Sequence, residues 1–556
     1  MLRKLLIAVA LAAVAAAPAR AAVTAQALLM PGVSYQRQVE FTPHGPVVLD
    51  VVVAPKPDGS LYTLSPALSN NGIVGTEKLT DIEKAAGATA TVVGVNGDFF
   101  APNPGKPTGI LMRNGVLESA PAANRSSLGI GADGSLTVRQ VSFDGTWRGT
   151  GQRRQFDLNA PPVAGHTTLY TSAWGPATPG ESGVVVDVIP SLPALVPNRV
   201  VTGVVSQVGS GGPTTIPPGG AVLVSRGGQA PHLTAEAPPG TTVEIRPTLT
   251  PNWSGMTGAI GGGPVIVANG KAIFRAKEAF GDPVLNARSA RSAIGQLQDG
   301  RIVLVTVEGG TPAYSAGMTN YELAVAVRRL GAQTAMSLGT GPSAAMAFDG
   351  SLLTRPTTGT EQPVADALFL SYYGVYAAPP SSATLSPNGD GVDDVQTFTY
   401  KLVRPANVNA SVVGPDRVPR VLLQDAEQPG VHTVQWDGAG AAEGSWRFVV
   451  TAGDDLGRTT TAERPFALNQ TLARLQVSRR TNGVTATFDV VHSAAVTVTV
   501  EKPNGIVVAT PLSKRLDPGT QSVDWNGSVA AGYRVRVVAA NPIGRAALQA
   551  PVTSRS

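Results

Sequence analysis

The chain has 556 residues, of which 43% are hydrophobic and 15% are charged, so it is long enough for several domains and apolar enough to pack their cores. Lys and Arg number 43 against 38 Asp and Glu, and no dense basic block is present, which argues against nucleic-acid binding. The lack of cysteine excludes disulfides, thiolate metal sites and a cysteine nucleophile, and the five scattered histidines disfavour catalytic zinc.

Residues 1–21 have the pattern of a secretory signal peptide. A basic start precedes an apolar run of about a dozen residues, and Ala19-Arg20-Ala21 has the small residues of a cleavage site. A membrane anchor is the alternative, but Pro18 and Arg20 interrupt the apolar run before it reaches the ~20 residues that span a bilayer. We expect cleavage after Ala21, no transmembrane anchor in the mature chain, and a secreted protein of the extracellular space or cell envelope.

The region 22–377 combines short strands with two helices. The spacing of apolar residues over 76–86 predicts a helix that ends at Gly87, and a second over 319–330 begins with Thr319 as N-cap and Glu322 in a capping box. Each helix leads into a strand, over 90–95 and 333–338. We expect a site to open after these strands, where loops on a rigid scaffold carry functional side chains.

The tail has a different organisation. A Pro- and Ser-rich linker at 378–383 precedes alternating strands, and a segment ending in Trp436-Asp437-Gly438 recurs as one ending in Trp525-Asn526-Gly527. The repeat predicts two immunoglobulin-like sandwiches at 384–470 and 471–556. The expected fold class is therefore α+β, with a β-rich catalytic-type domain containing a few helices, followed by two all-β sandwiches.

Three motifs of the first region carry polar or flexible residues. Asn96-Gly97-Asp98 follows a buried strand and reads either as a site or as a hairpin turn. The Gly261-Gly262-Gly263 run lacks the pattern of a phosphate loop and predicts a close backbone approach to a ligand or to another strand. Arg288 and Arg291 precede a strand, where they form either a phosphate clamp or surface arginines.

A series of ordered motifs resembles the phosphodiester glycosidase family over roughly residues 30 to 377. The motifs are Asn96-Gly-Asp-Phe-Phe, Leu169-Tyr-Thr with Trp174-Gly, Ile260-Gly-Gly-Gly-Pro, Arg291-Ser-Ala-Ile-Gly, Gly317-Met-Thr with Glu322-Leu-Ala, and Pro363-Val-Ala-Asp-Ala-Leu. The resemblance implies hydrolysis of a sugar-1-phosphodiester at the anomeric carbon, which releases a free sugar and leaves a phosphomonoester.

The sequence departs from the family pattern at two places. The family's Val-Asp-Gly-Arg is here Val307-Glu308-Gly309-Gly310, so the acid is kept as Glu and the arginine is lost. The family's Asn-Leu-Asp-Gly-Gly-Gly-Ser-Ser becomes a segment in which Gly339 replaces the acid.

A phosphomonoester is a good leaving group, so one carboxylate and a cationic clamp suffice in principle. The resemblance implies Asp98, Glu308 and Asn96 as catalytic candidates. It implies the following substrate and phosphate contacts: Arg291, Arg288, Gly261, Gly262, Gly263 and Ser343. The expected partner is an extracellular or cell-surface glycan with sugar-phosphodiester linkages. A glycan-binding or cell-wall-associated protein without turnover is the alternative.

The tail opens with Ser-Pro-Asn-Gly-Asp-Gly at 386–391, which resembles bacterial immunoglobulin-like domains of the flagellar hook-cap type. Asn388, Asp390, Asp393 and Asp394 place oxygen side chains on one glycine-rich loop, as Ca²⁺ coordination requires. The sequence therefore predicts a Ca²⁺ site in the first sandwich, with an acidic turn that holds no metal as the alternative. We expect no other cofactor, and the sandwiches to act as spacers or cell-surface attachment modules.

Overall fold

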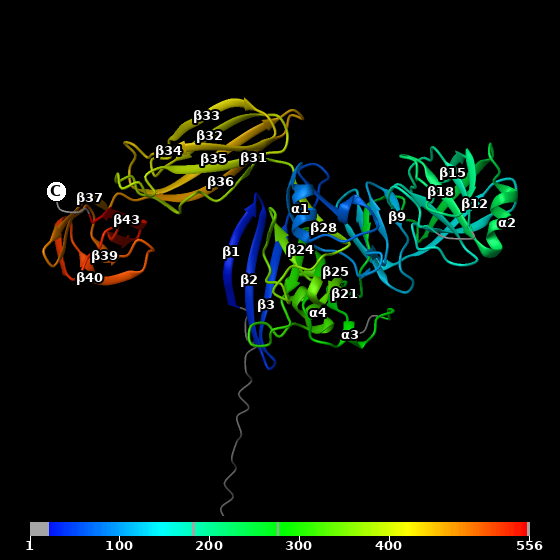
Figure 1. Ribbon diagram of the computed structural model, residues 1–556, viewed down its shortest axis with the longest axis horizontal. Helices are drawn as coiled ribbons and strands as arrows, with labels where there is room; N and C mark the ends of the chain where they lie inside the picture. The colour runs from blue at the N-terminus through cyan, green and yellow to red at the C-terminus, as the bar shows by residue number, and fades with distance from the viewer. Residues whose placement is uncertain (1–21, 181–183, 275–276, 553–556) are drawn as a thin grey trace, which may run out of the picture. The chain divides into compact units, whose positions relative to one another are not determined.

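The computed structural model describes residues 22–180, 184–274 and 277–552 (Figure 1). They fall into two compact units, one ending at Tyr372 and one beginning at Tyr373. The signal peptide predicted at 1–21 lies outside the described residues. Within the described ranges, no helix is long and apolar enough to span a membrane.

The fold is mostly β, with 53% of residues in strands and 7% in helices. The predicted α+β class was therefore wrong in its helical share, although the β-rich character is confirmed. The physical reason is the frequency of chain-breaking residues, because 63 Gly and 45 Pro favour turns between short strands over long helices.

Two sheets of the first unit carry most of the site. Sheet 1 has the strand order β1 (Ala22–Met30), β2 (Val33–Thr42), β3 (Gly45–Ala54), β24 (Ile302–Val307), β23 (Arg291–Leu297), β25 (Ala332–Thr340), β21 (Val265–Ala268), β22 (Lys271–Ala272). Sheet 2 has the order β27 (Ser351–Leu352), β26 (Met346–Phe348), β5 (Thr91–Asn96), β28 (Asp366–Tyr372), β4 (Tyr62–Leu68).

The two faces of sheet 1 differ in chemistry because side chains alternate along each strand. One face buries Leu49, Ala293 and Val305 in a core that includes Leu323 and Val327 of the long helix α4 (Asn320–Arg329). The opposite face bears a row of polar residues, since Asp50 pairs with Thr306 and Thr306 pairs with Ser292 across β3, β24 and β23. This polar face leads to the candidate site.

The predicted helices and the strands that follow them are confirmed. Helix α1 (Leu79–Gly87) precedes β5, and α4 precedes β25. At the start of α4, Thr319 Oγ1 accepts from the Glu322 N–H at 3.3 Å and Glu322 Oε2 accepts from the Thr319 N–H at 2.8 Å, which is the expected capping box. The short helices are α2 (Ala230–Glu236), α3 (Asp282–Leu285) and three 3₁₀ turns at Ser69–Asn71, Gly227–Gln229 and Gly341–Ser343.

Two further sheets and one small ladder complete the first unit. Sheet 3 has the order β11 (Leu136–Gln140), β10 (Ser126–Gly131), β20 (Met256–Ile260), β8 (Leu111–Arg113), β9 (Val116–Ser119). Sheet 4 has the order β16 (Val201–Val204), β19 (Thr242–Thr250), β12 (Ser142–Arg148), β13 (Arg154–Leu158), β14 (Thr167–Thr171), β18 (Ala221–Arg226), β15 (Val184–Ile189), β17 (Gln207–Ser210). Strands β6 (Phe100–Ala101) and β7 (Lys106–Pro107) pair with each other.

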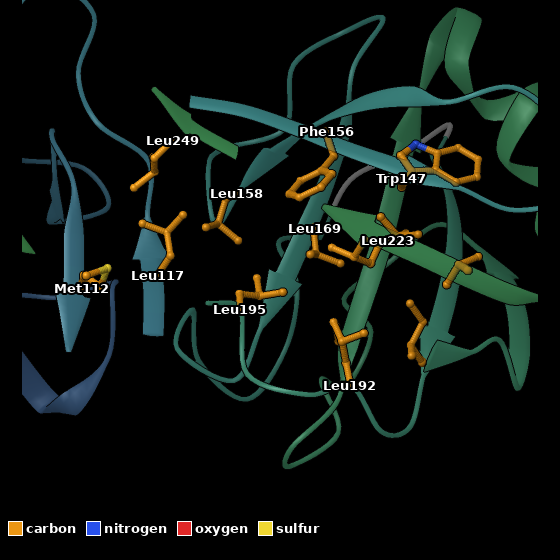
Figure 2. Close-up of a cluster of buried hydrophobic side chains, with 14 of the residues drawn as sticks. Met112, Leu117, Trp147, Phe156, Leu158, Leu169, Leu192, Leu195, Leu223 and Leu249 are labelled. Atoms are coloured by element: carbon orange, nitrogen blue, oxygen red, sulfur yellow. The ribbon is translucent and has the colours of Figure 1, made fainter. Parts of the chain in front are cut away.

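Sheet 4 forms an insertion whose apolar core is shared with sheet 3. Figure 2 shows Trp147, Phe156 and Leu223 within this core, which extends to Met112 and Leu117 of sheet 3. The insertion lies in the chain between the strands that build the candidate site, and burial of its large side chains gives it a stable fold on that scaffold.

The second unit repeats one strand order. The sheets of the first repeat have the orders β29 (Tyr376–Ala377), β31 (Gln396–Leu402), β34 (Gly430–Trp436) and β30 (Thr384–Leu385), β36 (Thr459–Leu468), β35 (Gly444–Asp454), β32 (Ala406–Val413), β33 (Pro419–Glu427). The sheets of the second repeat have the orders β37 (Leu472–Arg480), β38 (Gly483–Val490), β41 (Gly519–Asn526) and β40 (Val507–Leu516), β39 (Ala494–Glu501), β42 (Arg534–Asn541), β43 (Gly544–Pro551).

The order β36-β35-β32-β33 recurs as β43-β42-β39-β40, and β31-β34 recurs as β38-β41. Each repeat has a separate core, with Trp446 and Phe448 in the first and Phe488 in the second. The sequence repeat thus corresponds to two copies of one β architecture. Their assignment as immunoglobulin-like domains stays a prediction.

Candidate functional site

Two buried carboxyl groups lie together where β5 ends and β28 begins. The Asp98 N–H donates to Asp366 Oδ1 at 2.9 Å, and the Gly97 N–H donates to the Asp366 carbonyl at 2.9 Å. Asp98 is 3% exposed and Asp366 is fully buried, with Asp366 Oδ2 lacking a hydrogen-bond partner. Two buried carboxyl groups in one cluster, away from water, are typical of acid–base chemistry.

Glycines leave room for these carboxyl groups. A methyl group at Gly97 would lie 2.5 Å from Asp366 Oδ1, and one at Gly109 would lie 2.8 Å from Asp98 Oδ2. A methyl at Gly261 would also collide with Asp98 Oδ2. The Asp98 carboxylate instead accepts from the Phe99 N–H at 2.7 Å and the Gly109 N–H at 2.6 Å, which hold it in one orientation.

The pair is electrostatically unusual. Burial raises the pKa of Asp98 to about 6, although hydrogen bonds from Gly109 and Phe99 oppose the rise. Burial and the Asp98 charge together raise the pKa of Asp366 well above its ordinary value. Burial also lowers the pKa of the nearby Lys106 ammonium, which interacts with both carboxylates and donates to Ser119 Oγ at 3.0 Å.

Asn96 joins the acidic pair to the polar face of sheet 1. Its Oδ1 accepts from Ser292 Oγ at 2.5 Å and from the Ala345 N–H at 3.1 Å, while its Nδ2 donates to the Gly339 carbonyl at 3.0 Å. The side chain is 1% exposed and all three contacts are internal. Asn96 therefore positions the strand ends, and its sequence-predicted catalytic role has no direct geometric support.

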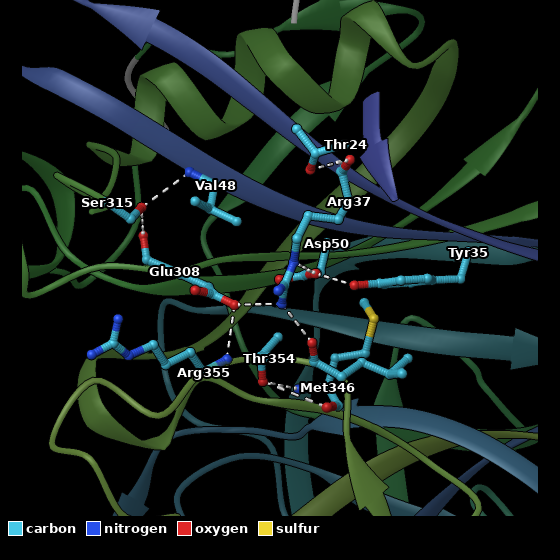
Figure 3. A network of polar contacts seen from close by, with 11 residues as sticks. Thr24, Tyr35, Arg37, Val48, Asp50, Glu308, Ser315, Met346, Thr354 and Arg355 are labelled. Carbon is cyan, nitrogen blue, oxygen red and sulfur yellow. Dashed lines mark hydrogen bonds and ion pairs between the residues drawn. The ribbon is translucent and has the colours of Figure 1, made fainter. Parts of the chain in front are cut away.

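Glu308 lies in a second polar network, shown in Figure 3. Arg37 donates to Glu308 Oε1 at 2.9 Å and to Asp50 Oδ1 at 2.9 Å, and the Arg355 N–H donates to Glu308 Oε1 at 2.8 Å. Tyr35 donates to Asp50 Oδ1 at 2.5 Å, and burial raises the pKa of Asp50 to about 7. Among the described residues, no hydrogen bond connects Glu308 with Asp98, so the two predicted acids occupy separate clusters.

The two arginines of the predicted phosphate clamp have internal partners. Arg288 donates to the Gly317 carbonyl at 2.8 Å and forms an ion pair with Glu322. Arg291 is fully buried and donates to the carbonyls of Met318 and Ala287, with its Nη1 unpaired. Burial lowers the pKa of Arg291 to about 10. This arrangement suits a structural role better than contact with a substrate phosphate.

The backbone of the Gly261-Gly262-Gly263 run lies close to other protein segments, as one of its two predicted interpretations requires. The Gly261 N–H donates to the Ile110 carbonyl at 2.7 Å, and the Gly263 N–H donates to the Ser337 carbonyl at 2.8 Å. A side chain at Gly262 would lie 2.8 Å from the Ser337 carbonyl. Ser343 Oγ donates to the Thr340 carbonyl at 3.3 Å. Of these groups only Gly261 lies against the Asp98 carboxyl, and the Gly261 and Gly263 N–H groups donate to protein carbonyls rather than to a phosphate.

Four side chains around Asp98 were missed by sequence reasoning, namely those of Arg125, Phe280, Thr108 and Asp366. The Arg125 guanidinium lies over the rings of Phe280 and Phe99, and its Nη1 is 3.5 Å from Thr108 Oγ1. Thr108 Oγ1 is in turn 3.3 Å from Asp98 Oδ2. Asp366, also missed as a site residue, lies in a motif of the family resemblance, whereas no sequence signal indicated Arg125 or Phe280.

In the loop predicted to bind Ca²⁺, carboxylates accept from backbone N–H groups. Asp394 accepts from Asn388 and from two glycines at 2.6–2.8 Å, and Asp390 accepts from Val392 at 2.8 Å and Gln549 at 2.7 Å. No cluster of three or more His, Asp or Glu suited to a metal occurs in the ranges that the structure describes. Ca²⁺ binding here stays a prediction.

Two sequence comparisons match parts of the chain. A family model described as phosphodiester glycosidase matches residues 197–371, a stretch that begins after Asp98 and includes Asp366. The uncharacterised SPbeta prophage-derived protein YomE of Bacillus subtilis (strain 168) is 35% identical over 88 residues, which are 16% of this chain and 14% of YomE.

Two solved structures extend the comparison. A hypothetical protein from Synechocystis aligns with a TM-score of 0.52 and 26% identity over 62% of this chain and 62% of that chain. The catalytic domain of zebrafish N-acetylglucosamine-1-phosphodiester alpha-N-acetylglucosaminidase, auto-inhibited by its pro-peptide, aligns with a TM-score of 0.34 and 13% identity over 64% of this chain and 88% of that chain. The chain thus matches less than two thirds of the length of YomE and of the Synechocystis protein.

Proposed function

We propose that this protein is a secreted hydrolase that cleaves sugar-1-phosphodiester linkages in extracellular or cell-surface glycans. The observation that carries the proposal is the pair of buried carboxyl groups, Asp98 and Asp366, beside the Lys106 ammonium. The match of residues 197–371 to a phosphodiester glycosidase model supports the substrate class.

In the proposed reaction, water replaces the phosphate at the anomeric carbon. The C1–O bond breaks, its electron pair stays on the phosphomonoester oxygen, and a carboxylate removes the proton of the attacking water or first attacks the carbon itself. Asp98 suits this role because the backbone N–H groups of Phe99 and Gly109 hold its carboxylate in one orientation. Asp366 would keep its own proton, because burial and the Asp98 charge raise its pKa, and Lys106 would offset the charge of Asp98.

The test is turnover on a panel of chromogenic sugar-1-phosphodiesters. Asp98→Asn is expected to lower kcat by about 10²- to 10⁴-fold, as for other lost acid–base groups, with the fold kept. Glu308→Gln is expected to act less strongly, because Glu308 belongs to the Arg37 network. Asp144→Asn removes an exposed carboxylate of sheet 4 and serves as the matched control. Full activity of Asp98→Asn would refute the assignment.

A glycan-binding protein without turnover is the second candidate, and one observation favours it. Gly339 stands where the resembled family carries an acid, and its Cα lies against the Asn96–Asp98 segment. If every phosphodiester resists hydrolysis while glycans still bind in a glycan-array assay, the binding function is the correct one. In either case the two C-terminal sandwiches are proposed as immunoglobulin-like spacers or attachment modules.

A further inference from the structure

Arg125 lies half-buried on an aromatic base next to Asp98. Its guanidinium carbon is 4.5 Å from the centroid of the Phe280 ring and 5.6 Å from that of Phe99, and the two rings are 5.5 Å apart. Stacking on aromatic faces is favourable for the planar guanidinium and leaves the N–H groups at its edge able to donate. The rings therefore hold the cation without consuming its hydrogen-bonding capacity.

The backbone around Arg125 is fixed on both sides. The N–H and hydroxyl of Ser126 donate to the Glu278 carboxylate at 2.7 and 2.8 Å, and the Ala279 N–H donates to the Asn124 carbonyl at 2.9 Å. Glu278 also accepts from the Val265 N–H at 2.8 Å, next to the glycine run. These bonds tie the segments that carry Arg125 and Phe280 to one another, so the stacked arrangement is preorganised.

The charge of Arg125 is offset in the protein only by a longer-range electrostatic interaction with the Asp98 carboxyl. Among the described residues, no carboxylate lies within ion-pair distance of its guanidinium, and its one hydrogen bond, at 3.5 Å, is to Thr108 Oγ1. Arg288 and Arg291, by contrast, are engaged with Glu322 and with backbone carbonyls. Arg125 is thus a preorganised cation with several free donors, one hydroxyl away from Asp98.

We propose that Arg125 is the phosphate-binding residue of the site, an inference that rests on the proposed hydrolase function for its substrate class. Its forked N–H groups match two phosphate oxygens, a pairing that neutral sugar hydroxyls do not reproduce. When the C1–O bond breaks, the extra negative charge appears on the phosphate oxygen, and Arg125 stabilises it there. The phosphate therefore binds beside Asp98, outside the buried pocket of Arg291.

The test is calorimetric titration of the full-length protein with inorganic phosphate, glucose 1-phosphate and glucose at low ionic strength. Arg125→Gln is expected to weaken binding of both phosphates by about 10- to 100-fold and to leave any glucose binding unchanged. Arg125→Lys keeps the charge without the forked N–H groups, and its phosphate affinity is expected to lie between those of wild type and Arg125→Gln. This second variant still tests the inference if Arg125→Gln fails to fold. Arg148→Gln, an exposed arginine of β12, is the control and is expected to match wild type.

Binding and turnover together separate this inference from the proposed function. Phosphate binding that depends on Arg125, in a protein that hydrolyses no phosphodiester, supports the inference and refutes the hydrolase. Hydrolysis that is equally fast in wild type and Arg125→Gln, or equal phosphate affinity in both, overturns the inference and leaves the hydrolase standing. A wild-type protein that binds neither phosphate at millimolar concentration also overturns it.

Discussion

Replacing Glu83 with Gln is expected to change the pH dependence of stability. Glu83 lies in α1, is 1% exposed and accepts one hydrogen bond, from the Gly350 N–H at 2.8 Å, while its Oε1 has no partner. Burial raises the pKa of this carboxyl from 4.5 to about 8, with the Asp349 and Glu361 charges adding to the rise. The folded state therefore keeps a proton that the unfolded state loses between pH 4.5 and 8, so Glu83 lowers stability as the pH rises.

The free-energy cost of Glu83 to folding follows from these two pKa values, because between them it grows by about 1.4 kcal/mol for each pH unit. The cost to folding is about 1 kcal/mol at pH 5 and about 4 kcal/mol at pH 8. Glu83→Gln removes this cost but buries an amide NH₂ in place of the unpaired oxygen, which costs about 1–3 kcal/mol at every pH. The variant is therefore expected to be no more stable than wild type at pH 5 and more stable by about 1–3 kcal/mol at pH 8.

Urea unfolding of wild type and variant at pH 5, 6, 7 and 8 measures the difference. Both proteins contain the same second unit, so its unfolding transition contributes equally to both curves and cancels in the difference between them. Asp81→Asn, which removes an exposed carboxylate from the same helix, is the control and is expected to show no such pH trend. A stability difference between wild type and Glu83→Gln that is constant from pH 5 to pH 8 would show that Glu83 is ionised in the folded protein and would refute the reasoning.

Three other predictions concern the site, the tail and the N-terminus. Gly339→Asp restores the acid of the resembled family, and it is expected to lower Tm without raising activity, because its Cβ would lie 2.9 Å from Asn96 Nδ2. The control Gly339→Ala should lower Tm similarly. A gain of turnover in the Asp variant alone would contradict this prediction. If the acidic loop binds Ca²⁺, chelation should lower Tm of the full chain and Asp390→Ala should remove that sensitivity, whereas equal Tm with and without chelator would favour the acidic turn. Intact-mass measurement of exported protein should give a chain that begins at Ala22, and full-length protein kept in the cytoplasm would end the export hypothesis.

Local chemistry determined the elements that the sequence predicted correctly. The capping box of Thr319 and Glu322 and the apolar spacing within each helix act over three or four residues, so they can be read directly and they reappear in α1 and α4. The tail repeat was also readable, because a duplicated sequence folds with a duplicated strand order. The β-rich character with few helices was readable too, because frequent Gly and Pro favour turns between strands, although the α+β label gave the helices more weight than the structure does.

Only the tertiary structure decided which polar groups meet. Asp98 and Asp366 are 268 residues apart in the sequence, and Arg37 and Glu308 are 271 apart, so sheet pairing and burial bring each pair together. The same packing turned the Arg291 guanidinium, a sequence-predicted phosphate ligand, onto backbone carbonyls. A buried charge must find partners wherever the fold supplies them, and that supply depends on register between distant strands, which no local pattern records.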